Sequence, residues 1–267
     1  MEPAARRERI TELVLLYRVI RAEWIYPALY EGLTIHSAHK DLQMMRDDGL
    51  LLPFEDADGR VYYAPTEKLA ALNGMHRSYG RSGGEVSRAQ RVGLAAYCMR
   101  YSLPHYPASD FAHAYPKLAA AGGEHGNYFV DVHDDQIDIG MIEVDCNTKG
   151  DVRRIVRKCV QHFRVRARNA AWKQLIDNGM FHVVIVAPSE GKKRVLEQKL
   201  GSNKKLLGPV YVEVVEELQP FLLQQDWRPS WQGRTSRSSS KDRPRSATGT
   251  RASGGDERSS GDSSSSS

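Results

Sequence analysis

The chain has 267 residues and a formal net charge of +5, and 40% of its residues are hydrophobic. This length allows two modest domains or one large one, and the basic balance favours an acidic partner without requiring one. Three cysteines without a close pair (Cys98, Cys146 and Cys159) argue against a disulfide framework or a zinc site and indicate a reducing, cytoplasmic setting. No signal-peptide pattern and no run near the roughly 20 apolar residues of a membrane span is present, so we expect no membrane association.

Residues 6–32 predict two helices. The first, residues 6–21, carries apolar side chains at helical spacing: Ile10, Leu13, Val14, Tyr17 and Ile20. Its arginines lie mostly off this stripe, so we expect them to form a solvated charged face. Pro27 suits the first turn of a short second helix, and Gly32 closes that helix.

Residues 34–63 predict a longer helix followed by a β-hairpin. Thr34 is a suitable N-cap, and Gly49 stands where a helix-ending glycine is expected. Between them runs an apolar stripe of Ile35, Ala38, Leu42 and Met45. Two short strands then flank a turn at residues 56–59.

Three helices and a hairpin in this order are typical of a winged helix-turn-helix domain, which we assign to residues 1–74. Side chains off the stripe of the third helix are small or polar and suit base edges and phosphates in a major groove. We therefore expect DNA contacts from Ser37, His39, Lys40, Gln43, Arg46 and, near the wing tip, Arg60. The alternative is an ordinary helix and hairpin with a solvated face.

The remaining chain predicts a linker, a second domain and a tail. Residues 75–84 are rich in Gly, Ser and Arg and favour an interdomain linker. Residues 85–225 alternate strands and helices, which predicts a small α/β domain with a mixed sheet, and the whole chain is then of the α+β class. Residues 226–267 have too little apolar content to offset chain entropy, so we expect a disordered tail.

Two features of the second domain carry further expectations. A long helix is expected from about residue 151 through Trp172 and Leu175. In the strand of residues 137–146, the apolar alternation changes phase after Met141, which favours a β-bulge near Gly140.

Carboxylates are concentrated in residues 131–151. Glu143 and Asp145 share a strand face by the two-residue period, Asp138 precedes them, and Asp131 lies on the hairpin partner. Carboxylates that meet at a strand end can hold a hard cation such as Mg²⁺. We take Glu143, Asp145 and Asp131 as candidate catalytic residues. The candidate metal ligands are Asp138, Glu143 and Asp145.

An acidic strand followed by a basic helix is the layout of restriction-endonuclease-like nucleases, whose motif is Pro-Asp and, after a gap, Asp/Glu-x-Lys. Asp145 stands where the lysine is expected, and Gly126-Asn127 stands near the place of Pro-Asp. Lys149 or Arg153 would have to reach back to Glu143. We therefore lean toward a protein without catalytic activity, in which the strand is a degenerate site or simply a solvated strand.

Three segments together resemble the replication-relaxation family of plasmid and mobile-element proteins. They are the run at residues 141–148, the basic run at residues 153–159, and the apolar strand at residues 181–186 followed by Ser189. That family pairs an N-terminal winged helix with a nuclease-like domain bearing an E-V-D strand, and the resemblance covers roughly residues 10–200. Its usual Pro-Asp is missing here. The resemblance implies a DNA-binding protein for plasmid replication, relaxation or mobilisation, or for transcriptional control of these.

Three functions follow as hypotheses. The first is a DNA-binding protein that needs no cofactor, with double-stranded DNA, a second copy of the chain, and relaxase or replication proteins as partners. The second is a Mg²⁺-dependent nuclease or nickase guided by the winged helix. The third is an interaction protein whose winged helix binds protein instead of DNA.

Overall fold

The structure is a computed structural model of the chain and describes residues 1–81, 84–120, 126–133, 136–147 and 152–223. These residues belong to one compact unit, Met1–Arg228. The tail predicted for residues 226–267 lies outside the described residues. In the described part of the chain, every helix is too short or too polar to span a membrane.

The N-terminal region contains three helices followed by a hairpin. The helices are α1 (Pro3–Tyr17), α2 (Ala22–Leu29) and α3 (Ile35–Asp47). The hairpin pairs β1 (Leu51–Glu55) with β2 (Val61–Pro65) in antiparallel register. The element order therefore agrees with the prediction from apolar spacing.

A short bridge between the helices and the hairpin was not predicted. Ile20, between α1 and α2, pairs antiparallel with Tyr63 of β2, and the two residues exchange backbone hydrogen bonds of 2.9 Å. The first helix ends at Tyr17, earlier than predicted, because Arg18 adopts a left-handed backbone (φ 59°). The chain can then leave the helix and run along β2.

A buried ion pair joins the three helices. Arg6 Nε donates to Asp41 Oδ2 over 3.1 Å, and the Tyr30 hydroxyl donates to the same oxygen over 2.9 Å. The solvated face expected for the first helix is therefore wrong at Arg6, which is 8% exposed. An arginine can be buried here because a carboxylate compensates its charge and the Tyr30 ring lies beneath its guanidinium.

Two short elements follow the hairpin. Helix α4 (Glu67–Leu72) is capped by Thr66, whose hydroxyl accepts a hydrogen bond from the Leu69 backbone amide. The 3₁₀ turn η1 (Arg77–Gly80) packs against α4 and occupies part of the predicted linker, of which residues 82–83 lie outside the described part.

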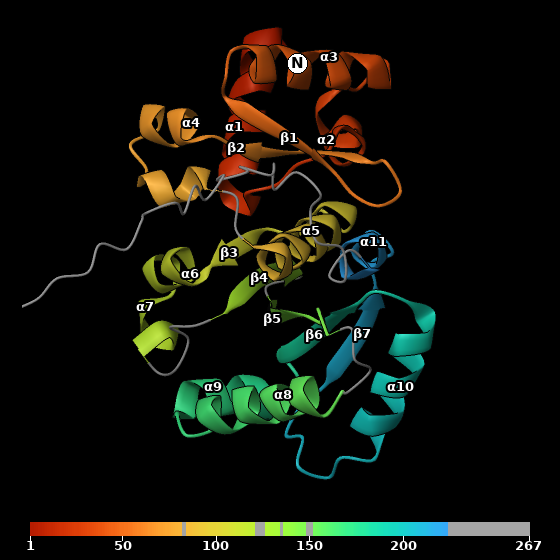
Figure 1. Cartoon of the computed structure of the whole chain (residues 1–267). Helices are drawn as coiled ribbons and strands as arrows, with labels where there is room; N and C mark the ends of the chain where they lie inside the picture. Colours follow the sequence, from red (N-terminus) through yellow and green to blue (C-terminus); the bar gives the residue numbers. More distant parts are fainter. Residues whose placement is uncertain (82–83, 121–125, 134–135, 148–151, 224–267) are drawn as a thin grey trace, which may run out of the picture. The chain divides into compact units, whose positions relative to one another are not determined.

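The second half of the chain forms a mixed five-stranded sheet of order β3-β4-β5-β6-β7 (Figure 1). Its strands are β3 (His105–Pro107), β4 (Asn127–His133), β5 (Gln136–Val144), β6 (Phe181–Ala187) and β7 (Val210–Val214). Strands β3, β4 and β5 pair antiparallel, whereas β6 and β7 continue the sheet in parallel. The predicted mixed sheet and α+β class are confirmed.

Helices cover both faces of this sheet. In Figure 1, α5 (Glu85–Arg100) and α11 (Leu218–Leu223) lie on one side, and α8 (Arg153–Arg166) and α9 (Ala170–Asp177) lie on the other. The remaining helices are α6 (Ala108–Ala114), α7 (Pro116–Leu118) and α10 (Glu190–Gly201). The single long helix expected from residue 151 is wrong. It breaks into α8 and α9 because Asn169 caps a new helix by accepting from the amides of Ala171 and Trp172.

The core continues across the predicted boundary between residues 74 and 85. One apolar cluster contains Ile10, Val14 and Tyr62 from the N-terminal region together with Val92, Ile142 and Val186 from the second half. Tyr17 also stacks on His105 at a ring distance of 5.3 Å. Whether residues 1–74 fold alone stays a prediction, but in this structure they share their core with α5 and the sheet.

Strand β5 is buried on both faces, which explains its irregular apolar pattern. Met141 packs in the cluster under α8, and Ile142 packs in the opposite cluster under α5. The pairing of β5 with β4 is continuous from Gln136 to Ile142, so the predicted bulge near Gly140 is wrong. The adjacent apolar residues Met141 and Ile142 are explained because helices cover both faces of the strand, so the alternation of side chains continues without a bulge.

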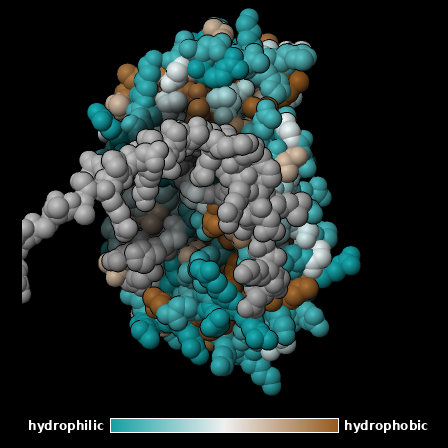
Figure 2. Space-filling view, in the orientation of Figure 1, coloured by the Kyte–Doolittle hydropathy of each residue, from teal (hydrophilic) through white to brown (hydrophobic). Residues whose placement is uncertain are grey.

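The face of the molecule seen in Figure 2 is mostly hydrophilic. Its hydrophobic residues lie in small dispersed groups among the described residues shown there. Such a distribution is ordinary for a protein surface and does not by itself mark an interface.

Gly140→Ala should destabilise the sheet. A Cβ at Gly140 would lie 2.0 Å from the Phe129 ring on the neighbouring strand, so the ring must shift, and we expect a loss of about 1–3 kcal/mol in the free energy of unfolding. Urea denaturation measures this change. Gly201→Ala is the matched control, because its Cβ meets no atom within 4 Å; equal effects at the two positions would contradict the packing argument.

Candidate functional site

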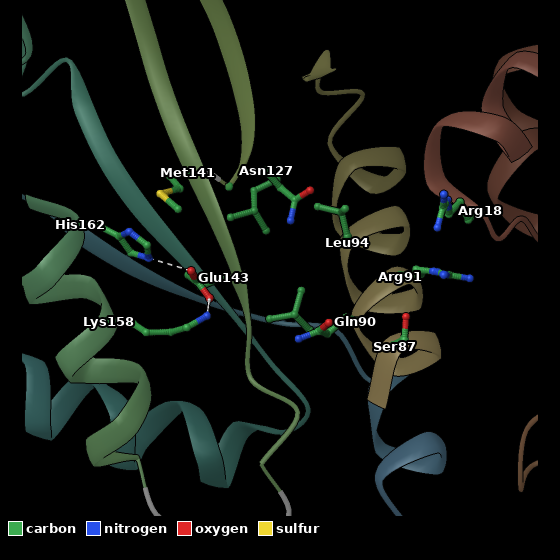
Figure 3. A pocket seen from close by; sticks show the side chains of 13 residues that line it. Arg18, Ser87, Gln90, Arg91, Leu94, Asn127, Met141, Glu143, Lys158 and His162 are labelled. Atoms are coloured by element: carbon green, nitrogen blue, oxygen red, sulfur yellow. Dashed lines mark hydrogen bonds and ion pairs between the residues drawn. The ribbon is translucent and has the colours of Figure 1, made fainter. Parts of the chain in front are cut away.

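Glu143 lies near the end of β5, at the edge of the β4 pairing. Asn127, the first residue of β4, stands opposite Ile142, so Glu143 is one residue beyond the β4–β5 register. On its other side β5 still pairs with β6, where Glu143 stands opposite Ile185. The backbone of Glu143 is therefore held by the sheet while its side chain reaches α8 (Figure 3).

Two side chains of α8 contact the Glu143 carboxylate (Figure 3). Lys158 Nζ donates to Oε2 over 2.8 Å, and His162 Nε2 donates to Oε1 over 2.7 Å. Lys158 and His162 are four residues apart, so one turn of helix brings both to the same side. Burial alone would raise the pKa of Glu143, but hydrogen bonds from His162 and Lys158 outweigh it and hold this pKa below its ordinary value.

These three side chains line one end of a cavity of about 550 Å³. Asn127, Leu94 and Gln90 lie along its middle, and Arg18, Ser87 and Arg91 line its other part (Figure 3). The cavity thus joins an ion-paired carboxylate to a pair of arginines across a partly apolar wall. Such a lining suits a ligand that carries both charged and apolar groups.

Asp145 has a different partner. It follows the last residue of β5 and is 3% exposed. Lys192 Nζ of α10 lies 3.3 Å from Asp145 Oδ2, an ion pair whose geometry is not that of a hydrogen bond. The backbone amide of Asn147 donates to Asp145 Oδ1 over 3.1 Å. Asp145 therefore connects the end of β5 to α10 instead of joining Glu143.

Asp138 and Asp131 lie toward the other end of the hairpin, opposite each other in register. His182 Nδ1 donates to Asp138 Oδ1 over 3.1 Å. Five residues of strand separate Asp138 from Glu143, which is about 17 Å. The structure does not bring the predicted ligands Asp138, Glu143 and Asp145 together, and no group of three His, Cys, Asp or Glu in the described residues is arranged to hold a metal ion.

The residues predicted to contact DNA lie on α3 and in the hairpin turn. Lys40, Gln43 and Arg46 are exposed on α3, whereas Ser37 and His39 are partly buried. Arg46 pairs with its neighbour Asp47 over 2.7 Å. Arg60 is held on the turn, 3.3 Å from Asp58 Oδ2 and 3.9 Å from Asp56 Oδ2. Lys40 and Gln43 are thus the most available members of the set.

Lys158 and His162 were not among the predicted site residues. Arg153, one candidate to reach Glu143, instead lines an open cleft with Arg157 and Lys199, and Lys149, the other, lies outside the described residues. The four-residue spacing of Lys158 and His162 beside buried Cys159 was visible in the sequence. What the spacing could not show is that Glu143 would face this side of the helix.

Glu143→Gln should lower the free energy of unfolding at pH 7 by about 1.5–3 kcal/mol, because it removes the buried charge that accepts hydrogen bonds from Lys158 and His162. The folded-state pKa of Glu143 lies below its ordinary 4.5. The stabilisation is therefore complete above that value and is lost as the pH falls through the lowered pKa. Urea denaturation between pH 7 and 3 measures both effects.

Asp177→Asn is the matched control, since its ion pair with Lys173 is more than half exposed and contributes little. A stability difference between Glu143→Gln and the parent protein that stays constant across this pH range would contradict the assignment.

Comparisons with models of protein families, with curated proteins and with solved structures gave no match to this chain.

Proposed function

We propose that this protein binds double-stranded DNA through a winged helix formed by residues 1–74, with α3 as the recognition helix. The observation that carries the proposal is the Ile20–Tyr63 bridge. It is a one-residue bridge beside the hairpin, between α1 and α2, where winged-helix domains have their first short strand. Sequence patterning alone suggested only the helices and the hairpin.

The position of α3 supports this proposal. Its inner side is anchored by Ala38, Leu42 and Met45 in the core and by the Asp41 ion pair with Arg6. Its outer side presents Lys40 and Gln43 to solvent. A helix held rigidly on one side with a cation and an amide on the other is suited to a major groove, where lysine neutralises phosphate or reads guanine and glutamine reads adenine.

The biological setting is proposed from the family resemblance of the sequence. By that resemblance the protein would act on the DNA of a plasmid or mobile element, in replication, relaxation, mobilisation or their transcriptional control. A second copy of the chain and relaxase or replication proteins are its proposed partners. These roles all require DNA binding first, so the binding test comes before them.

The double variant Lys40→Ala/Gln43→Ala should bind its preferred duplex about 10- to 100-fold more weakly, because it removes one charge and one base-reading amide from α3. The preferred duplex is first selected from genomic fragments, and fluorescence anisotropy then measures the affinity. Lys173→Ala/Gln174→Ala is the matched control, since it removes the same groups from exposed positions of a different helix, α9. Equal losses in both variants, or no fragment bound at low salt, would refute the proposal.

A second candidate function is a metal-dependent DNA nuclease or nickase, and the contact of Lys158 with Glu143 favours it. On α8, Lys158 would take the place of the lysine that the E-V-D strand lacks, and it lines the same cavity as Asn127 at the start of β4. Glu143 and Asn127 both line the cavity, where the Asn127 amide oxygen lies 3.3 Å from His105 Nε2. Mg²⁺ in phosphoryl-transfer sites uses only one or two protein carboxylates with substrate phosphate and water.

On this reading Glu143 and Asn127 would hold Mg²⁺, and the chemistry that the ion supplies when bound is polarisation of the phosphate and activation of a water. His162 or Lys158 would have to move from Glu143 to admit the cation, because both carboxylate oxygens are now engaged. Lys158, which is half exposed, would then orient a water or stabilise the leaving group.

Incubation of supercoiled plasmid with the protein and Mn²⁺ separates the two functions. A nuclease should nick the plasmid, Glu143→Gln should abolish nicking, and Lys158→Met should slow it at least 100-fold while the control Lys173→Met does not. Nicking that survives Glu143→Gln would show that the site is elsewhere. Absence of nicking by the parent protein would leave DNA binding without catalysis as the function.

A further inference from the structure

Three arginines gather between the end of α1, the hairpin and α5. Arg18, Arg88 and Arg91 line one small pocket together, and Arg18 and Arg91 also line the large cavity that holds Glu143. Within the described residues, none of the three forms an ion pair with a carboxylate. Burial lowers the pKa of Arg91, and the neighbouring charges of Arg18 and Arg88 lower it further.

Aromatic rings hold two of these arginines in place. The Arg18 guanidinium lies over the Tyr79 ring at 4.0 Å, and that of Arg88 lies over the Phe54 ring at 5.5 Å. Stacking of this kind occupies the flat face of a guanidinium and leaves its N–H edges for other partners. The left-handed backbone of Arg18 places this side chain at the turn that ends α1, beside α5.

Uncompensated like charges in a half-buried place destabilise the folded protein, and an anion would remove that cost. Phosphate suits an arginine site, since its oxygens accept paired hydrogen bonds from the guanidinium fork. The lining of the large cavity also contains Ser87, one turn before Arg91 on α5, and its hydroxyl can donate a further hydrogen bond (Figure 3).

We propose that the Arg18–Arg91 end of the large cavity binds the phosphate group of a nucleotide. The cavity volume of about 550 Å³ lies in the range of small-molecule sites and accommodates a mononucleotide. Leu94, Met141 and Val144 provide an apolar wall for a base or sugar, and Gln90 and Asn127 provide amides for its polar edge. The nucleotide is either free or the end of a DNA strand.

This site is separate from the duplex-reading surface of α3. No residue of α3 lines the cavity. Nucleotide binding in the cavity therefore does not depend on the proposed binding of duplex DNA by α3. The Lys40→Ala/Gln43→Ala variant should retain nucleotide binding unchanged.

Isothermal titration calorimetry of the full chain with deoxyadenosine monophosphate, deoxyadenosine, inorganic phosphate and a 5′-phosphorylated hexanucleotide tests the proposal. We expect the phosphate-bearing probes to bind and deoxyadenosine to bind at least 10-fold more weakly. Arg91→Gln and, separately, Arg18→Asn should each weaken binding of deoxyadenosine monophosphate at least 10-fold. Asparagine is chosen at position 18 because it tolerates the left-handed backbone.

Arg154→Gln on the exposed side of α8 is the control for loss of one positive charge. Arg91→Gln should also raise the thermal unfolding midpoint without ligand, since it removes a charge from a crowded cationic place. Tighter binding of the hexanucleotide than of deoxyadenosine monophosphate would identify a strand end as the source of the phosphate, and equal binding would identify a free nucleotide. Failure of all phosphate probes to bind, or equal affinities for Arg91→Gln and Arg154→Gln, would overturn the proposal.

Discussion

Burial of β5 on both faces is the constraint on which the rest of this structure depends. Its even-numbered residues Ile142 and Val144 pack toward α5, and its odd-numbered residues Ile139 and Met141 pack toward α8. Helix α5 can approach closely because Gly93 faces Val144 and Leu218, where a Cβ would lie under 3 Å from each. The same α5 then packs against α1 and α2, so one strand organises the layers of the whole described unit.

The same alternation positions the polar end of the strand. Glu143 continues the face of Met141 and therefore meets α8, where apolar residues give way to Lys158 and His162. The carboxylate keeps its charge at this place because hydrogen bonds from His162 and Lys158 satisfy it, since burial by itself opposes its charge. The acidic strand and the basic helix are therefore parts of one electrostatic arrangement, whichever reaction or ligand it serves.

Basic residues of this chain fall into three environments with different consequences. Arg6 and Arg166 are buried: Arg6 with Asp41, and Arg166 among the rings of Tyr128, Trp172 and Phe181. Both are structural, because desolvated cations without such partners would be costly. Lys40 and the exposed arginines of α8 are solvated and suit long-range attraction of a polyanion. Arg18 and Arg91 are half-buried and, among the described residues, form no ion pair with a carboxylate, which is why a phosphate site is proposed there.

Local patterns in the amino-acid sequence were sufficient for most of the secondary structure. The spacing of Ile35, Ala38, Leu42 and Met45 marks α3, and the nearly continuous apolar run Phe181–Ala187, interrupted only by His182, marks a strand buried on both faces. Such patterns show which side of a helix or strand is buried. The order of the strands and helices that they mark also indicated the mixed sheet. They could not indicate which element would provide that core, and the N-terminal helices therefore looked like a separate head.

Only the tertiary structure decided the pairings on which the candidate sites rest. Asp41 pairs with Arg6, which is 35 residues away in the sequence, and Glu143 pairs with His162, which is 19 residues away. Asp138 and Asp145, which looked like ligands of one ion, are drawn to His182 and Lys192 on other elements. The physical reason is that helical and strand periods describe neighbours within about one turn or two residues, whereas buried charges are satisfied by whichever partner the packing of distant elements brings within hydrogen-bond distance.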